Sequence, residues 1–142
     1  MRYLIFLAAL TAACVRPAAV TELEFITPSP SPVFSSAVRV GNLLFLSGQI
    51  GTDTANRLVA GGIQAEARQA LNNIKAVLER NGSSLDRVVK CTVFLADIKD
   101  YTEFNNIYVT YFRVRKPARS ALAASGLALG ARVEVECIGA VG

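Results

Sequence analysis

The chain has 142 residues, enough for one domain with its own hydrophobic core. Hydrophobic residues make up 52% of it and charged residues 18%, which excludes an intrinsically disordered protein, and no apolar run is long enough for a multi-span membrane protein. The formal charge of +4 comes without a run of basic residues, so we expect no nucleic-acid partner. The chain has no histidine, which excludes Ser-His-Asp and Cys-His triads and histidine-ligated metal sites. We expect no metal.

Residues 1–20 have the order typical of an export signal. Arg2 precedes an apolar stretch, and small residues follow it. The residues before Cys14 resemble a bacterial lipobox, whose cysteine receives lipid after cleavage, although Thr11 stands where leucine is usual. We predict a signal peptide or lipoprotein signal, and hence an exported protein, either periplasmic or anchored to the membrane through lipid on Cys14. The alternative is a spurious N-terminal extension, which would leave the protein cytoplasmic.

A segment rich in proline and serine, residues 21–33, is predicted to be a linker, and residues 34–142 the folded domain. The strands predicted from β-rich and alternating patterns cover residues 34–40, 43–47, 88–96, 118–124 and 132–141. Gly41-Asn42 is typical of a two-residue hairpin turn between the first two. The intervening stretch 48–62 is predicted to be a loop.

Two helices are predicted between these strands. Apolar residues at three- and four-residue steps indicate an amphipathic helix of about 18 residues that begins at Ile63 and ends at Asn81-Gly82. The second helix begins at Tyr101, where Asp100 and Glu103 have the spacing of a capping box. The helix is predicted to end before residues 113–117.

The element order β-β-α-β-α-β-β predicts an α+β sandwich, in which two helices pack on one face of a mixed sheet. The other face then needs cover, which in a small chain favours an oligomer. Cys91 and Cys137 lie on separate predicted strands without C-x-x-C spacing. We interpret them as two small buried side chains, with a disulfide between them as the alternative in an oxidising compartment.

Four motifs follow one another in the domain. They are Ser-Gly-Gln-Ile at 47–50, Val-Phe-Leu at 93–95 with Asp97, Pro-Ala-Arg-Ser at 117–120 and Val-Glu-Val-Glu at 133–136. In this order and spacing they resemble the RidA/YjgF family, over almost the whole of residues 34–141. The resemblance implies a chorismate-mutase-like α+β fold, a homotrimer with a small-molecule cleft at each subunit interface, no cofactor, and hydrolysis of reactive 2-enamine and 2-imino acids to 2-keto acids and ammonia.

The resemblance also implies roles for individual residues. Arg119 would hold the substrate carboxylate, for which the always-charged, fork-shaped guanidinium is well suited. Glu134 would activate the attacking water or pass protons to the departing nitrogen. The other positions implied to line the substrate site are Phe34, Ser47, Gly48, Asn105, Ser120 and Ala121. Two of them depart from the family pattern, because Phe34 stands where many members have tyrosine and Ala121 where some have cysteine.

Two other functions compete with imine hydrolysis. The first is a non-catalytic trimeric protein that binds small carboxylate metabolites, which the departures at Phe34 and Ala121 favour. The second is RNA cleavage or translation inhibition, ascribed to some relatives. The absence of histidine and of a basic run argues against this second function.

Overall fold

The computed structural model describes residues 22–27 and 33–142. Within them, the strands are β1 (Leu23–Ile26), β2 (Ala37–Val40), β3 (Leu43–Leu46), β4 (Gln49–Ile50), β5 (Val88–Leu95), β6 (Ala118–Ala123) and β7 (Val133–Ala140). The α-helices are α1 (Gly62–Arg80) and α2 (Tyr101–Tyr111), and single 3-10 turns occur at Leu85–Arg87, Ile98–Asp100 and Ala128–Gly130.

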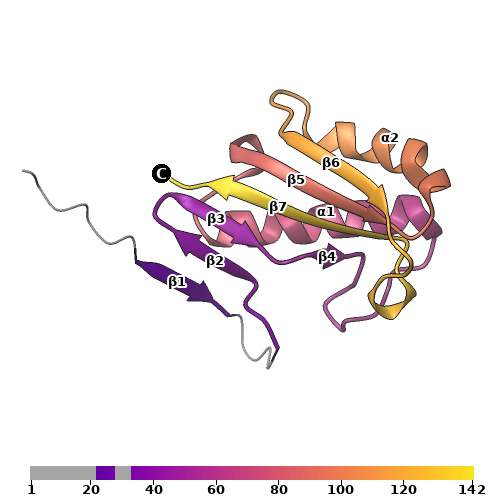
Figure 1. Cartoon of the computed structure of the whole chain (residues 1–142), viewed down its shortest axis with the longest axis horizontal. Helices are drawn as coiled ribbons and strands as arrows, with labels where there is room; N and C mark the ends of the chain where they lie inside the picture. The colour runs from indigo at the N-terminus through magenta and orange to yellow at the C-terminus, as the bar shows by residue number, and fades with distance from the viewer. Residues whose placement is uncertain (1–21, 28–32) are drawn as a thin grey trace, which may run out of the picture.

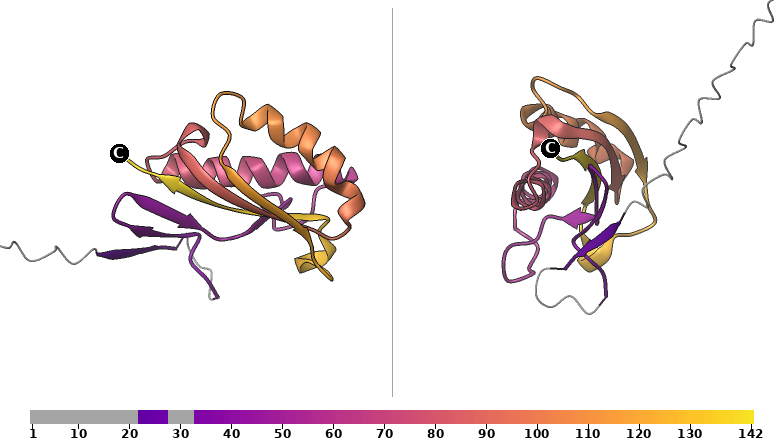
Figure 2. Two further views of the ribbon diagram at one scale, coloured as in Figure 1. Left: turned by 45° about the horizontal axis from the view of Figure 1, so that its top comes forward. Right: turned by 90° about the vertical axis from the view of Figure 1, so that its left-hand side faces the viewer.

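All the strands belong to one sheet, in the spatial order β1-β2-β3-β7-β5-β6, with β4 also paired to β7 (Figure 1). The β5–β6 pair is parallel and the other pairs are antiparallel. Both α-helices lie on one face of this sheet (Figure 2). The predicted α+β fold is therefore confirmed, and the opposite face, called the open face below, carries no helix in the described chain.

Helix α1 follows from its sequence pattern. Its side chains at three- and four-residue steps, including Leu71, Ile74 and Leu78, are fully buried against the sheet. Burying each one stabilises the fold by about 1.5–3 kcal/mol. The helix ends at Asn81, and Gly82 then has a φ of 75°, a left-handed conformation that glycine adopts without a steric cost.

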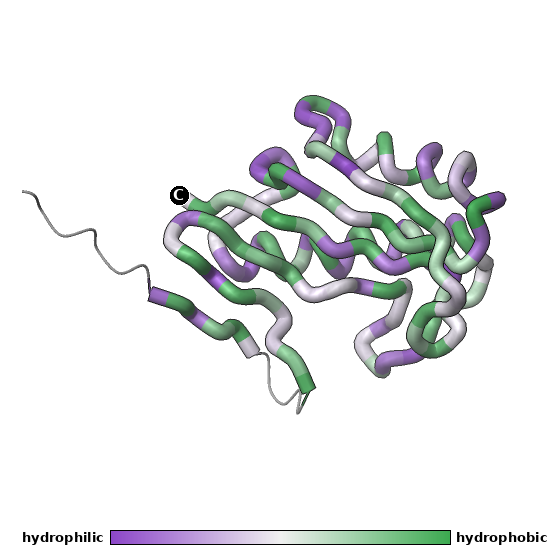
Figure 3. Tube along the Cα trace, in the orientation of Figure 1, coloured by the Kyte–Doolittle hydropathy of each residue, from purple (hydrophilic) through white to green (hydrophobic). Residues whose placement is uncertain are grey.

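The strands alternate between the two faces of the sheet. In β7, Val133, Val135 and Cys137 are buried under the helices, so Glu134 and Glu136 point to the open face. Hydrophobic residues also run along β3 and the C-terminal part of β7 (green in Figure 3). The hydrophobic core therefore lies between the helices and the face of the sheet that they cover.

Strand β1 was not predicted, because its residues fall in the segment expected to be a linker. Leu23 and Phe25 alternate with Glu24 in the period of a strand, and the segment pairs antiparallel with β2. Arg39 on β2 donates a hydrogen bond to Glu24 at 2.8 Å. The prolines that suggested a linker begin only at residue 28, after this strand ends.

The predicted capping box at α2 is wrong. Asp100 stands at the N-cap position, but its side chain caps no backbone N–H. Its carboxylate instead accepts two hydrogen bonds from the guanidinium of Arg132, at 2.6 and 2.9 Å. The guanidinium is positively charged and binds both carboxylate oxygens at once, whereas a backbone N–H is an uncharged donor to one of them, which explains the difference. The same pair raises the pKa of Arg132, first through hydrogen bonding and then through the charge of Asp100.

A second buried acid joins this network from α1. Glu66 accepts a hydrogen bond from the backbone N–H of Arg132 at 2.7 Å. Asp100 is only 7% exposed and Glu66 only 6%. The residue that precedes β7 thus binds one carboxylate before α2 and another on α1, so the network fixes both helices against the sheet.

We expect Asp100→Asn to destabilise the protein by about 1–3 kcal/mol, because an amide can accept only one of the two charge-assisted hydrogen bonds from Arg132. Urea unfolding followed by circular dichroism measures the loss. Glu79→Gln is the matched control, since Glu79 pairs with Lys75 at 3.7 Å on the surface of α1 and its removal should cost less than about 0.5 kcal/mol. Equal effects of the two variants would contradict the structural role given to Asp100.

Cys91 and Cys137 are joined by a disulfide, which corrects the interpretation of two reduced, buried side chains. The residues lie directly opposite each other on β5 and β7, with Cα atoms 4.1 Å apart. Both are buried beneath the helices. The sequence pattern predicted the burial, whereas the pairing depends on the register of two strands that are far apart in the chain.

The purified protein should therefore carry no reactive thiol at Cys91 or Cys137. Iodoacetamide treatment of the unfolded, unreduced protein should leave both unmodified, and prior reduction should expose both to alkylation, as peptide mass mapping can determine. Closing a loop across 46 positions contributes about 2–4 kcal/mol to stability, so reduction should lower the unfolding free energy by that amount. Alkylation of both cysteines without reductant would show that the pair is not bonded.

Candidate functional site

Arg119 lies on the edge strand β6 and points to the helix-covered side of the sheet. Its guanidinium carbon lies 4.6 Å from the ring centre of Tyr108, 5.6 Å from that of Tyr101 and 6.0 Å from that of Phe104. Nη2 donates a hydrogen bond to the Tyr101 hydroxyl at 3.2 Å. The aromatic rings of α2 thus hold a cation at the edge of the sheet by cation–π attraction and one hydrogen bond.

Two buried polar atoms on α2, the helix that packs against this arginine, have no hydrogen-bond partner in the described chain. Tyr108 is 5% exposed, and neither its hydroxyl nor Oδ1 of Asn105 has a hydrogen-bond partner within the described part of the chain. Burial raises the pKa of Tyr108 to about 12, while the charge of Arg119 opposes that shift. Ala121, two residues after Arg119, packs against the core from the same side. We call Arg119, Ala121 and Asn105 the arginine half-site.

Glu134 belongs to a different group of residues. It lies on β7 opposite Ile50 of β4 and points to the open face. Gly48 immediately precedes β4, and a methyl group built on it would collide with the Glu134 carboxylate. Glycine at this position therefore makes the space that the carboxylate occupies.

Phe34 and Ser47 complete this second group, which we call the glutamate half-site (Phe34, Ser47, Gly48 and Glu134). The Ser47 hydroxyl donates a hydrogen bond to the carbonyl oxygen of Ser35 at 2.6 Å, and its backbone N–H bonds the Ser36 carbonyl at 3.0 Å. These bonds fix the segment that carries Phe34, whose side chain is 60% exposed. The family pattern gave Ser47 a ligand-facing role, and in this structure its proton is used to hold the neighbouring segment.

The two half-sites do not meet within one chain. Arg119 is level with Cys91 and Cys137 across the sheet, whereas Glu134 lies two strands away on β7 and three residues before Cys137. Standard strand spacings place the two Cα atoms about 14 Å apart. Because the side chains also point to opposite faces, a small molecule cannot contact both from one copy of the chain.

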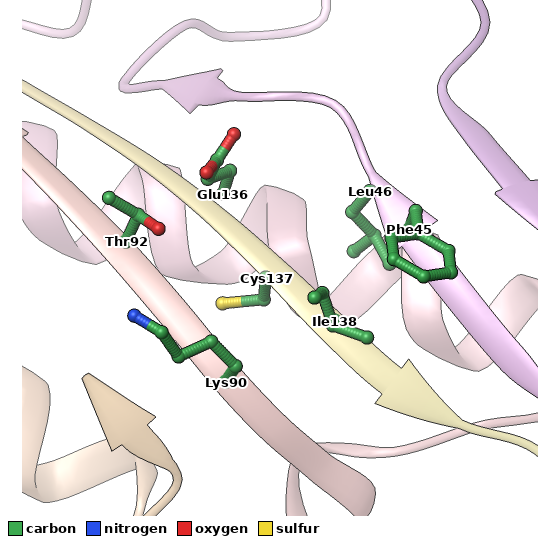
Figure 4. A pocket seen from close by; sticks show the side chains of 7 residues that line it. All are labelled: Phe45, Leu46, Lys90, Thr92, Glu136, Cys137 and Ile138. Atoms are coloured by element: carbon green, nitrogen blue, oxygen red, sulfur yellow. The ribbon is translucent and has the colours of Figure 1, made fainter. Parts of the chain in front are cut away.

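Ser120 lies apart from both half-sites. Its hydroxyl accepts a hydrogen bond from Lys90 Nζ at 2.8 Å. Lys90, Thr92, Glu136 and Ile138 are among the residues that line a cavity of about 180 Å³ on the open face (Figure 4). This cavity contains no residue of either half-site, so we do not assign the substrate site to it.

Sequence reasoning missed the aromatic partners of Arg119. Tyr101, Phe104 and Tyr108 recur at helical spacing, which indicated only an apolar helix face. The available signal was a tyrosine at the exposed start of a helix, because core packing does not explain a residue at that position and its hydroxyl can bind another group. The pKa of Tyr101 is lowered, mainly by hydrogen bonding from the Asn105 side chain and then by the charge of Arg119.

Comparison with known proteins gives a consistent result. The family model described as endoribonuclease L-PSP matches residues 26–141. Protein HMF1 of Saccharomyces cerevisiae is 50% identical over 113 residues, which cover 80% of this chain and 88% of that protein. The 2-iminobutanoate/2-iminopropanoate deaminase of Mus musculus is 42% identical over 119 residues, covering 82% and 88%.

Solved structures agree with the fold. The crystal structure of YEO7_yeast superimposes with a TM-score of 0.80 at 47% identity, covering 85% of this chain and all of that one. The YjgF gene product of E. coli superimposes with a TM-score of 0.74 at 31% identity, covering 80% of this chain and 92% of that one. Both contain the mixed sheet and helix layer described above.

The comparisons contradict the predicted localisation. Among the relatives is Protein MMF1, mitochondrial, of Saccharomyces cerevisiae, which is 39% identical over 113 residues covering 80% of this chain and 78% of that protein. None of the names of the relatives given above describes an exported lipoprotein. The prediction of an exported, periplasmic or lipid-anchored protein is therefore wrong. It relied on a short pattern in residues 1–20, including Cys14, which lie outside the described residues. In the described part of the chain, no helix is long and apolar enough to cross a membrane.

Proposed function

The chain belongs to the RidA/YjgF family, and from this premise we propose that it hydrolyses reactive 2-enamine and 2-imino acids to 2-keto acids and ammonia. Relatives from several mammals carry the name 2-iminobutanoate/2-iminopropanoate deaminase at 42–43% identity. The family model matches residues 26–141, a range that includes both half-sites.

The observation that carries the proposal is the state of Arg119. A guanidinium has five N–H donors, and within the described residues only one hydrogen bond of this side chain is made, to Tyr101. The remaining donors suit the two oxygens of a carboxylate, with which arginine forms bidentate pairs. A cation held rigidly by aromatic rings, with most of its donors unused, supports a role in binding a small carboxylic acid.

The reaction needs a nucleophile and proton transfers rather than a redox step. Water adds to the imine carbon and forms a C–O bond, while a proton moves to the nitrogen. The C–N bond of the resulting carbinolamine then breaks, which releases ammonia and leaves the 2-keto acid. Glu134 is the proposed group that takes a proton from water and returns it to the nitrogen, a role suited to a half-buried carboxylate. Arg119 orients the substrate through its carboxylate.

Replacing Arg119 tests the proposal. We expect Arg119→Ala to lower kcat/KM by about tenfold to a hundredfold or more, since a charge-assisted pair with a carboxylate contributes about 1.5–3 kcal/mol. Arg119→Lys should restore only part of the activity, because an ammonium is a point charge that cannot hold two oxygens in a fixed plane. The assay is release of ammonia from 2-iminobutanoate that a threonine dehydratase generates in the same reaction.

Arg80→Ala at the exposed end of α1 is the matched control and should have wild-type activity. Full activity of Arg119→Ala would disprove the assigned site. The alternative function, a non-catalytic protein that binds small carboxylate metabolites, would be supported if the wild type released no ammonia but bound 2-oxobutanoate through Arg119.

We also propose that the active form is a homotrimer. On the open face, Phe25, Val38, Phe45 and Ile138 stand side by side across β1, β2, β3 and β7. Phe25 is 65% exposed and Phe45 41% in the single chain. A continuous apolar row of this kind favours burial against another copy. A closed ring would also place the arginine half-site of one copy against the glutamate half-site of the next.

Mixing two inactive variants tests this shared site. Arg119→Ala keeps an intact glutamate half-site and Glu134→Gln keeps an intact arginine half-site. If the site forms between copies, refolding the two together should restore about a quarter of the wild-type activity, because one random pairing in four joins two intact halves. Each variant refolded alone provides the baseline. No recovery in mixed oligomers confirmed by light scattering would mean that each site lies within one chain.

A further inference from the structure

The hydroxyl of Tyr101 has an unusual position at the first turn of α2. It accepts a hydrogen bond from Nη2 of Arg119 at 3.2 Å, and the side chain is 39% exposed. A phenol also carries one proton to donate. Within residues 22–27 and 33–142, no hydrogen bond donated by this hydroxyl is present. The donor therefore lies beside the guanidinium with its proton unused.

A second observation indicates that a polar ligand belongs here. Oδ1 of Asn105 and the hydroxyl of Tyr108 are buried without partners in the described chain, and both come from the helix that carries Tyr101. Buried polar atoms are nearly always hydrogen-bonded in native proteins, so two unpaired ones on the helix whose rings contact Arg119 need an explanation. A bound molecule with both acceptors and donors, such as a 2-imino acid, supplies one.

We propose that Tyr101 is a substrate-binding residue. Its hydroxyl donates a hydrogen bond to one oxygen of the substrate carboxylate, while Arg119 donates to the same group from the other side. This inference rests on the proposed function, because it takes the carboxylate of a 2-imino acid to be the group that Arg119 binds. Tyr101 adds an uncharged hydrogen-bond donor that loses its proton at high pH. A site built on arginine alone would not have this pH dependence.

The pH dependence follows from the surroundings of Tyr101. Arg119 on β6 is the charged group that faces it, and Asn105 and Tyr108 are its neighbours on α2. The pKa of Tyr101 lies below the usual 10.0, whereas burial raises those of Tyr108 and Tyr111. As pH rises, Tyr101 is therefore the first of these three to ionise. The phenolate can no longer donate, and its negative charge neutralises Arg119 and repels a carboxylate.

The experiment compares two Tyr→Phe variants on the same helix. Tyr101→Phe removes the proposed donor. Tyr111→Phe is the matched control, because the Tyr111 hydroxyl bonds Asn72 Oδ1 at 2.9 Å and the Arg68 carbonyl at 3.1 Å on α1. Calorimetric titration with 2-oxobutanoate, a stable product with the same carboxylate, gives the affinity of each variant and of Arg119→Ala.

At about pH 7 we expect Tyr101→Phe to bind 2-oxobutanoate about tenfold more weakly than the wild type, and Tyr111→Phe to bind it normally. Between about pH 7 and pH 10, wild-type affinity should fall steeply, while that of Tyr101→Phe should stay nearly constant. A merely structural tyrosine would not produce this difference in pH profile.

The outcomes separate the two proposals. If Arg119→Ala loses binding while Tyr101→Phe binds like the wild type with the same pH profile, the role of Tyr101 is disproved and the proposed function stands. If Arg119→Ala also binds like the wild type, the carboxylate site assigned in the proposed function is itself wrong.

Discussion

Arg119 and Ser120 are neighbours in the sequence and point to opposite faces of the sheet. Side chains alternate between the two faces along every strand, and the helices cover only one face, so this alternation determines which residues are covered by helices and which lie on the open face. On the covered side, Arg119 meets the aromatic rings of α2. On the open side, Ser120 meets Lys90, and Glu134 lies against Gly48. Because Arg119 on β6 and Glu134 on β7 point to opposite faces, one copy of the chain cannot bring both to the same ligand, so the proposed reaction would need a second copy.

The covered side is held in place by ionic bonds as well as by apolar packing. Arg132 binds Asp100 before α2 and, through its backbone, Glu66 on α1. The helix that begins immediately after Asp100 carries Tyr101 and the other partners of Arg119. The orientation of the Arg119 guanidinium thus depends on a partly buried network that contains none of the residues proposed to touch the substrate.

The sequence predicted a helix or strand well where the pattern of apolar residues within that element is enough to identify it. The apolar spacing of α1 and the alternation of β7 predicted both elements within one or two residues, because each needs only a single buried face. Three features could not be read in this way. Strand β1 depends on pairing with β2. The Asp100 side chain binds Arg132 rather than the backbone of α2, and the disulfide depends on the register of β5 and β7. Each is a contact between segments that are distant in the sequence, and the periodicity within one segment does not indicate which other segment it contacts.

The site showed the same division. The family motifs indicated Arg119, Glu134 and Gly48 as candidate site residues, since these residues lie in short, recognisable segments. They did not indicate that Arg119 and Glu134 lie on opposite faces, although the alternation of the two strands implies it once their register is known. Nor did they indicate Tyr101, because an aromatic residue at helical spacing is usually part of a core.

The two half-sites also differ in how their residues are distributed along the chain. Tyr101, Asn105 and Arg119 lie within one continuous β-α-β unit, in which α2 connects the parallel strands β5 and β6. The glutamate half-site joins residues near the start of the domain to a strand at its end. Short-range contacts close small loops at a low entropic cost, whereas long-range ones wait for most of the chain to be ordered. The arginine half-site can therefore assemble early in folding, and the glutamate half-site is complete only when the last strand has entered the sheet.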